Sequence, residues 1–208
     1  MQKVGYVEAL KPLFGDMLVR RLRGAREFLA WRSRNYAAPY PNSVKRRTIQ
    51  RNAIAEGIFV ETGTYLGDTT AFSRRFSARV ISIEPDVPLY RRAAKRFAGD
   101  PGIELINATS EAAFPDLLAA LSGSITFWLD GHYSGGITHQ GPTTTPIAFE
   151  LKIIAANLDR FSNCVVMVDD LRCFGNDDGY PTPAYLSQWA TEHGFRWSAE
   201  HDIMIMRR

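Results

Sequence analysis

The sequence has little cysteine and no long apolar run. Its 208 residues include two cysteines, Cys164 and Cys173, and four histidines. So few thiols disfavour a disulfide framework or a cysteine-held metal, and they favour a reducing, cytoplasmic setting. No apolar stretch approaches the roughly 20 residues that a membrane-spanning helix needs, and the N-terminus lacks the apolar core and cleavage site of a secretory signal. We therefore expect a cytoplasmic protein without a membrane span.

A strong net charge is lacking too. Lysine and arginine total 25, aspartate and glutamate total 22, and the formal net charge is +3. The basic residues concentrate between Arg20 and Arg51, where they either bind an anionic partner such as nucleic acid or form a solvated helix face. Aromatic residues are not interleaved with these charges as single-strand binding requires. The solvated face is favoured, and a nucleic-acid partner is not expected.

Two nucleotide-binding fingerprints, G-x-G-x-x-G and the P-loop, are also missing. In their place the chain has FVETGTYLGDTT over residues 59–70, which is typical of a buried strand, a glycine turn and a helix start. Gly63 and Gly67 let the backbone turn sharply and approach a ligand closely. Asp68, Thr69 and Thr70 are expected to cap the helix that follows. Open α/β sheets bind nucleosides at such a strand end, although an ordinary structural turn is the alternative.

From residue 57 onward, strand and helix patterns alternate. The expected strands are 58–61, 79–84, 103–106, 125–130 and 164–168, and the expected helices are 69–76, 89–97, 110–121, 143–158 and 183–193. Segments 195–198 and 203–206 are expected to close the sheet as an antiparallel hairpin. This alternation predicts an α/β fold with a Rossmann-like, doubly wound, mostly parallel seven-stranded sheet.

The first 56 residues are expected to form an N-terminal helical extension before a domain of residues 57–208. Residues 7–31 show helical spacing, and Gly15 and Gly24 suggest a division into two helices. A Pro-rich break at 37–42 precedes a basic helix at 43–55. The extension either covers an acceptor cleft or makes a subunit contact in a homo-oligomer.

The pattern from Gly57 to the C-terminus resembles the class I S-adenosylmethionine-dependent methyltransferases. The stretch from Glu61 to Gly67 matches the family's first motif, in a Gly-x-Tyr-x-Gly form most similar to the catechol O-methyltransferase branch. The resemblance implies that this turn wraps the methionine part of S-adenosylmethionine (SAM). It assigns to the cofactor site Glu61, Thr62, Gly63, Thr64, Tyr65 and Gly67, with Asp68, Thr69 and Thr70 near the cofactor carboxylate.

Glu84 ends the second expected strand, Pro85 follows it, and together they complete the nucleoside pattern. Two carboxylate oxygens fit the two vicinal ribose hydroxyls, so Glu84 is assigned to the ribose; a solvated strand-end acid is the alternative. The same acid occurs in nicotinamide-binding folds, so it indicates a nucleoside and not a reaction. Ser110 matches the family's adenine contact, and it can also cap the helix that it opens.

Three aspartates follow the fourth and fifth expected strands. Asp130 ends one strand, and Asp169 and Asp170 end the next. Parallel strand ends share one sheet edge, where unpaired carboxylates would repel and raise one another's pKa. A hard divalent cation such as Mg²⁺ resolves this repulsion. The arrangement resembles metal-dependent O-methyltransferases of the catechol type and the macrocin-type sugar enzymes. The alternative is structural: Asp170 caps a turn and Asp169 pairs with an arginine such as Arg172.

His132 is the candidate general base, with Asp130 beside the reacting groups. A histidine titrates near neutral pH and can accept a hydroxyl proton that a metal has acidified. His132 departs from the family pattern, and it could instead ligate metal or hold the loop. His139 is a second candidate. Both lie in a Gly-rich segment that is either a lid or an ordinary loop.

Together these features predict a SAM-dependent, Mg²⁺-dependent O-methyltransferase acting on a small hydroxylated acceptor, a sugar or other natural product. Three alternatives remain open. The first is a metal-independent methyltransferase that keeps the glycine turn and Glu84. The second is a nicotinamide-dependent oxidoreductase, which Glu84 suits and the glycine spacing does not. The third is a nucleic-acid binder that uses the basic segment.

Overall fold

The computed structural model describes residues 11–130, 145–176 and 179–208, with side chains from residue 21 onward. Two helices come first, α2 (Lys11–Ser33) and α3 (Asn42–Asn52). The strands are β1 (Ile58–Thr62), β2 (Arg79–Ile83), β3 (Ile103–Ile106), β4 (Gly123–Leu129), β5 (Phe161–Val168), β6 (Arg196–Glu200) and β7 (Ile203–Arg207). The helices among them are α4 (Asp68–Ser73), α5 (Val87–Phe97), α6 (Ser110–Ala120), α7 (Ile147–Ala156) and α8 (Pro183–Glu192).

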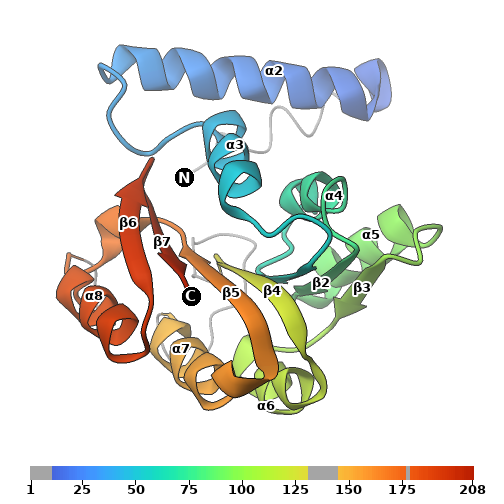
Figure 1. Ribbon diagram of the computed structural model, residues 1–208. Coiled ribbons are helices and arrows are strands. Elements are labelled where there is room, and N and C mark those ends of the chain that lie inside the picture. The colour runs from blue at the N-terminus through green and yellow to red at the C-terminus, as the bar shows by residue number, and fades with distance from the viewer. Residues whose placement is uncertain (1–10, 131–144, 177–178) are drawn as a thin grey trace.

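The seven strands form one sheet in the order β3-β2-β1-β4-β5-β7-β6. Strands β1 to β5 pair in parallel, and β7 is antiparallel to both β5 and β6. Helices lie on both faces, and α2 lies across one end of the molecule over α3 (Figure 1). The predicted doubly wound α/β sheet, with its antiparallel hairpin at the edge, is confirmed.

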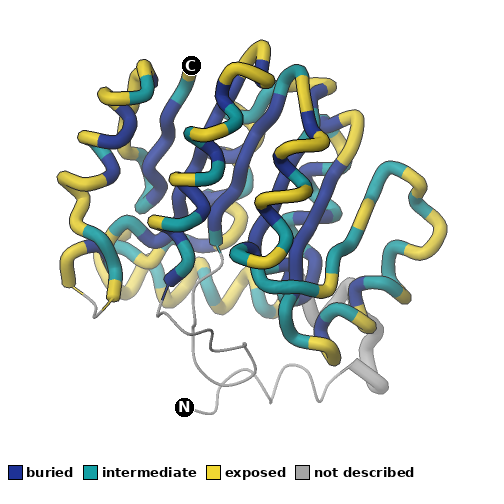
Figure 2. The backbone as a smooth tube through the Cα atoms, turned by 90° about the horizontal axis from the view of Figure 1, so that it is seen from below, coloured by how far each residue is buried: buried dark blue, intermediate teal, exposed yellow. Residues whose placement is uncertain are grey.

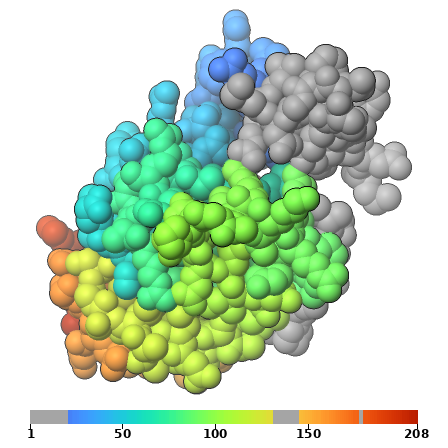
Figure 3. Space-filling view, turned by 90° about the vertical axis from the view of Figure 1, so that its right-hand side faces the viewer, coloured from blue at the N-terminus to red at the C-terminus, as the bar shows by residue number. Residues whose placement is uncertain are grey.

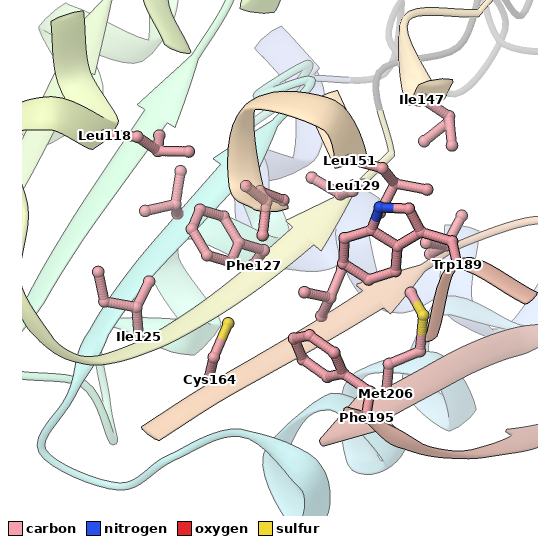
Figure 4. Packing of buried hydrophobic residues seen from close by; sticks show 14 of the residues in the cluster. Leu118, Ile125, Phe127, Leu129, Ile147, Leu151, Cys164, Trp189, Phe195 and Met206 are labelled. Carbon is pink, nitrogen blue, oxygen red and sulfur yellow. The ribbon is translucent and has the colours of Figure 1, made fainter. Parts of the chain in front are cut away.

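The larger core lies between the sheet and the helices α6, α7 and α8. It is built from side chains that alternate strand positions direct to this face, such as Phe127, Leu129 and Val166, and from Leu151 and Trp189 of the covering helices (Figure 4). The central strands are buried while the outer faces of the helices are exposed (Figure 2). Burial on both faces explains why the central strands read as continuous apolar runs.

A second, smaller core covers the opposite face of the sheet. Phe59, Trp128 and Met167 point to this side, where Ile49 of α3 packs against them and is only 1% exposed. Helix α3 is therefore part of the sheet's covering layer. No helix in the described ranges is long and apolar enough to span a membrane.

Several element details differ from the sequence prediction. Helix α2 runs unbroken through Gly24, so a division into two helices at that glycine is wrong. Helix α7 begins at Ile147, because Pro146 occupies its N-cap position; residues 143 and 144 lie outside the described ranges.

The predicted helix caps also need correction. Gly67 is the N-cap of α4, and no side-chain hydrogen bond caps that helix, so the predicted capping by Asp68, Thr69 and Thr70 is wrong. Thr109 caps α6 by accepting a hydrogen bond from the Ala112 N–H, so Ser110 does not. Asp68 and Thr70 make other contacts instead, with arginines and with Glu61 respectively.

Candidate functional site

The glycine turn after β1 has the backbone shape that its sequence predicts. Gly63, Tyr65 and Gly67 all have positive φ, of 87°, 49° and 72°. A side chain at Gly67 would place its Cβ 2.7 Å from the Phe97 ring. The Gly63 N–H donates to the Ile83 carbonyl over 3.0 Å, which fixes the turn against the end of β2. Glycine is needed at position 67 for both conformation and space.

Glu61 lies beneath this turn in a cluster of hydroxyl groups. It is 1% exposed, and one of its oxygens accepts hydrogen bonds from Thr70 over 2.5 Å and from Ser82 over 2.6 Å. Burial raises the pKa of Glu61 to about 8, although the hydrogen bonds from Ser82 and Thr70 oppose the increase. The acid thereby joins β1, β2 and the first turn of α4 under the proposed methionine site.

Glu84 ties the turn to the end of β2. One carboxylate oxygen accepts from the Tyr65 N–H over 2.7 Å, and the other accepts from the Asp86 N–H over 3.0 Å. Asn107 donates to the Glu84 carbonyl over 2.7 Å. The carboxylate therefore lies at the turn where the ribose assignment requires it, while the assignment itself stays a prediction.

Asp68 makes ion pairs instead of a cap. Arg23 of α2 lies 2.7 Å from its carboxylate and Arg96 of α5 lies 3.0 Å away. Arg96 also donates to the Leu66 carbonyl within the turn. The glycine turn is thus held from outside by arginines of two helices.

The three predicted aspartates converge next to the turn. The Asp130 N–H donates to the Thr62 carbonyl at the end of β1, and the Asp169 N–H donates to the Leu129 carbonyl at the end of β4. One carboxylate oxygen each from Asp130, Asp169 and Asp170 lies within 4.8 Å of the other two. We call these three residues the acidic cluster. The sheet-edge argument that placed them together is correct.

A lysine of the N-terminal segment contacts this cluster. The Lys45 Nζ lies 2.7 Å from the Asp169 carboxylate and 2.6 Å from that of Asp170. Arg172 lies 2.6 Å from the same Asp170 oxygen, Oδ1, and also pairs with Asp202. The arginine predicted as an alternative partner of Asp169 therefore pairs with its neighbour, Asp170.

The electrostatics of the cluster follow from burial and charge. Burial, repulsion by Asp130 and repulsion by Asp170 raise the pKa of Asp169 above its ordinary value, although Lys45 opposes them. Burial alone would lower the pKa of Lys45, but the surrounding carboxylates outweigh it and raise that pKa. The cluster is a largely buried group of carboxylates whose mutual repulsion Lys45 and Arg172 offset.

A further buried acid lies on the other face of β1. Glu150, in the first turn of α7, is fully buried, and neither of its oxygens has a hydrogen-bond partner among the described residues. Burial raises the pKa of Glu150 to about 7, although the nearby hydroxyls of Ser110 and Thr62 oppose the increase. Glu150 therefore faces Ser110 and Thr62, two residues assigned to the cofactor site.

Sequence reasoning missed Lys45 and Glu150. Lys45 lies 124 positions from Asp169 and is one of several basic residues in its helix, so no local pattern distinguishes it. Glu150 reads as one polar residue on an amphipathic helix. His132 and His139 lie outside the described residues, and their proposed roles stay predictions.

Comparison with known proteins supports the fold. ErmE, a 23S rRNA methyltransferase, matches with 16% identity and a TM-score of 0.50, over 80% of this chain and 66% of its own. The N-methyltransferase NodS from Bradyrhizobium japonicum matches with 13% identity and a TM-score of 0.52, over 79% of this chain and 93% of its own. The chain has the SAM-dependent methyltransferase fold.

A third structure with the same fold comes from Streptococcus mutans and is described as a methyltransferase in complex with SAH. It is 13% identical with a TM-score of 0.52, over 83% of this chain and 100% of its own. This chain spans just under two thirds of the ErmE chain. No protein-family model and no curated protein matches the sequence. Identities this low establish the methyltransferase fold alone.

Proposed function

We propose that the protein is a SAM-dependent methyltransferase that methylates a hydroxyl oxygen of a small acceptor. The observation that carries this proposal is the glycine turn of the methyltransferase fold, with the acidic cluster hydrogen-bonded to the ends of the adjacent strands. SAM supplies a sulfonium methyl group, whose C–S bond breaks as the acceptor oxygen bonds to the carbon. The residues that we assign to it are Glu61, Thr62, Gly63, Thr64, Tyr65, Gly67, Asp68, Thr69, Thr70, Glu84, Pro85, Ser110 and Asp130.

We also propose that the acidic cluster holds a divalent cation, Mg²⁺ in the first instance. Its three carboxylates are the hard oxygen ligands that this ion prefers, and their 4.8 Å convergence fits one ion. Such an ion would supply Lewis-acid stabilisation of the acceptor oxyanion. Asp130, Asp169 and Asp170 would hold it, while the turn and Glu84 position the methyl donor beside them. His132 would accept the hydroxyl proton.

The direct test is methyl transfer from labelled SAM to a panel of hydroxylated sugars and phenols, with Mg²⁺ present. We expect a labelled methylated product. A chelator should abolish its formation, and added Mg²⁺ should restore it. Asp169→Asn should lower activity by about 100-fold, because it replaces an anionic ligand of the ion with a neutral amide. Lys45 keeps its second partner in this variant, Asp170, so the protein should stay folded by circular dichroism. Full activity in chelator would refute the metal role and leave the methyltransferase proposal standing.

A second acceptor class, RNA, is favoured by one observation. The side chains of Arg21, Arg26, Arg32, Arg34 and Arg47 are exposed on α2, α3 and the segment between them. Figure 3 shows this segment, in blue, at one end of the molecule. ErmE is described as a 23S rRNA methyltransferase. Including ribosomal RNA in the acceptor panel decides between the classes, because methylation of RNA should weaken steeply with salt.

A further inference from the structure

Lys45 and the proposed cation need two of the same carboxylates, Asp169 and Asp170. The Lys45 ammonium is within 2.7 Å of Asp169 and 2.6 Å of Asp170, and the lysine side chain is 10% exposed. A Mg²⁺ ion binds carboxylate oxygens at about 2.0–2.1 Å. Two cations held by the same pair of carboxylates would lie close together and repel strongly. The ammonium and the metal therefore exclude one another.

Lys45 is not needed to attach its helix. The next turn of α3 is fastened to the β6–β7 hairpin by Thr48, which shares a 2.8 Å hydrogen bond with His201, and by Arg51, which lies 2.6 Å from Glu200. Ile49, between them, is part of the smaller core. Buried ion pairs add little net stability. An anchored helix that places a buried ammonium on two carboxylates suggests a functional contact.

Arg172 overlaps the proposed metal ligands less than Lys45 does. Its guanidinium bridges Asp170 and Asp202, its side chain is 36% exposed, and it contacts the cluster at Asp170. It therefore contacts one of the three proposed ligands, through the same Asp170 oxygen as Lys45, and it keeps Asp202 as a second partner. Lys45, by contrast, bridges two of the three proposed ligands.

We propose that Lys45 is an exchangeable internal cation: it neutralises the acidic cluster in the metal-free enzyme and withdraws when a divalent ion binds. This inference rests on the proposed metal site. The lysine's flexible four-carbon stem allows the ammonium to leave while α3 stays anchored. Lys45 thus sets the metal affinity of the site, and its amine leaves the two carboxylates in the metal-bound enzyme.

The first test measures Mn²⁺ binding directly, by calorimetry or by the loss of free Mn²⁺ signal in electron spin resonance. Lys45→Met keeps the length of the side chain and removes its charge. We expect Lys45→Met to bind one Mn²⁺ on the order of tenfold or more tighter than the natural protein, because a competing unit charge at contact is removed. Arg172→Met is the matched control and should change the affinity by much less. Adding Asp170→Asn to Lys45→Met should reverse the gain.

The second test needs no substitution. Amine acetylation followed by mass spectrometry reports how accessible each lysine is. Lys45 is buried in the metal-free protein, whereas Lys95 and Lys152 are exposed and serve as internal controls. We expect Mn²⁺ to increase acetylation of Lys45 several-fold and to leave the controls unchanged.

The outcomes separate the two proposals. Equal Mn²⁺ affinity in the natural protein and Lys45→Met, or unchanged acetylation of Lys45 at saturating Mn²⁺, overturns the exchange and keeps the metal site. No Mn²⁺ binding to either protein overturns both the exchange and the metal site. Binding of SAH, measured on the same samples, tests the methyltransferase assignment independently of either result.

Discussion

At the scale of single residues, the site is unusual in its buried acids. Glu61, Glu150 and Asp169 are each less than 10% exposed and each has a raised pKa. Removing a carboxylate from water disfavours its charged form. Sequence reasoning assigned Glu61 and Asp169 from their motif and strand-end positions. It could not assign Glu150, because only the packed fold shows that this polar helix residue points inward.

The raised pKa of Glu150 predicts a pH-dependent stability. A folded-state pKa of about 7, above the ordinary value, means that the folded protein holds a proton which the unfolded chain releases. The stability that this bound proton contributes is fully present at low pH and is lost as the pH rises through about 7. The side chain in Glu150→Gln cannot ionise. The free energy of unfolding of this variant, relative to that of the natural protein, should therefore rise by up to about 3 kcal/mol between pH 5 and pH 8.

Chemical denaturation at pH 5 and pH 8 measures this gain as a difference in the free energy of unfolding. Asp116→Asn, at an exposed position of α6, is the control and should show little pH-dependent change. A Glu150→Gln effect of the same size at both pH values would show that the carboxyl does not titrate in this window.

At the scale of elements, the unit β1–turn–α4 carries the proposed cofactor site. The glycine spacing predicted the turn, because positive φ at Gly63 and Gly67 is a local requirement. The caps were mispredicted for a non-local reason: Arg23 and Arg96 pair with Asp68, and Glu61 accepts from Thr70. A single sequence does not show which distant partner takes a polar side chain.

Gly67→Ala tests this unit. The new Cβ would meet the Phe97 ring at 2.7 Å in a backbone conformation with φ of 72°, which side chains rarely adopt. We expect a loss of about 1–3 kcal/mol in stability and a marked loss of SAH affinity. Gly99→Ala is the control, since its Cβ would meet nothing within 4 Å. Thermal unfolding with and without SAH measures both effects. Natural SAH affinity in Gly67→Ala would mean that the turn is not the cofactor site.

At the scale of the whole molecule, the sheet could be predicted and the role of the N-terminal segment could not. The alternation of strand and helix patterns predicted the sheet. The rule that parallel strand ends share one edge predicted the acidic cluster. The contact of Lys45 with Asp169 joins residues 124 positions apart through tertiary packing that no motif records. Helix α3 packs on the sheet through Ile49 and reaches the cluster through Lys45. The division of the chain at residue 56, the oligomeric state and the cytoplasmic setting stay predictions.

Titration of the purified protein with SAH by calorimetry, with NAD as the comparison ligand, tests the central claim most directly. We predict saturable 1:1 binding of SAH, at least roughly tenfold weaker binding in Glu84→Gln because a ribose acceptor oxygen is replaced by a donor, and no saturable binding of NAD. Saturable binding of NAD without binding of SAH would contradict the account.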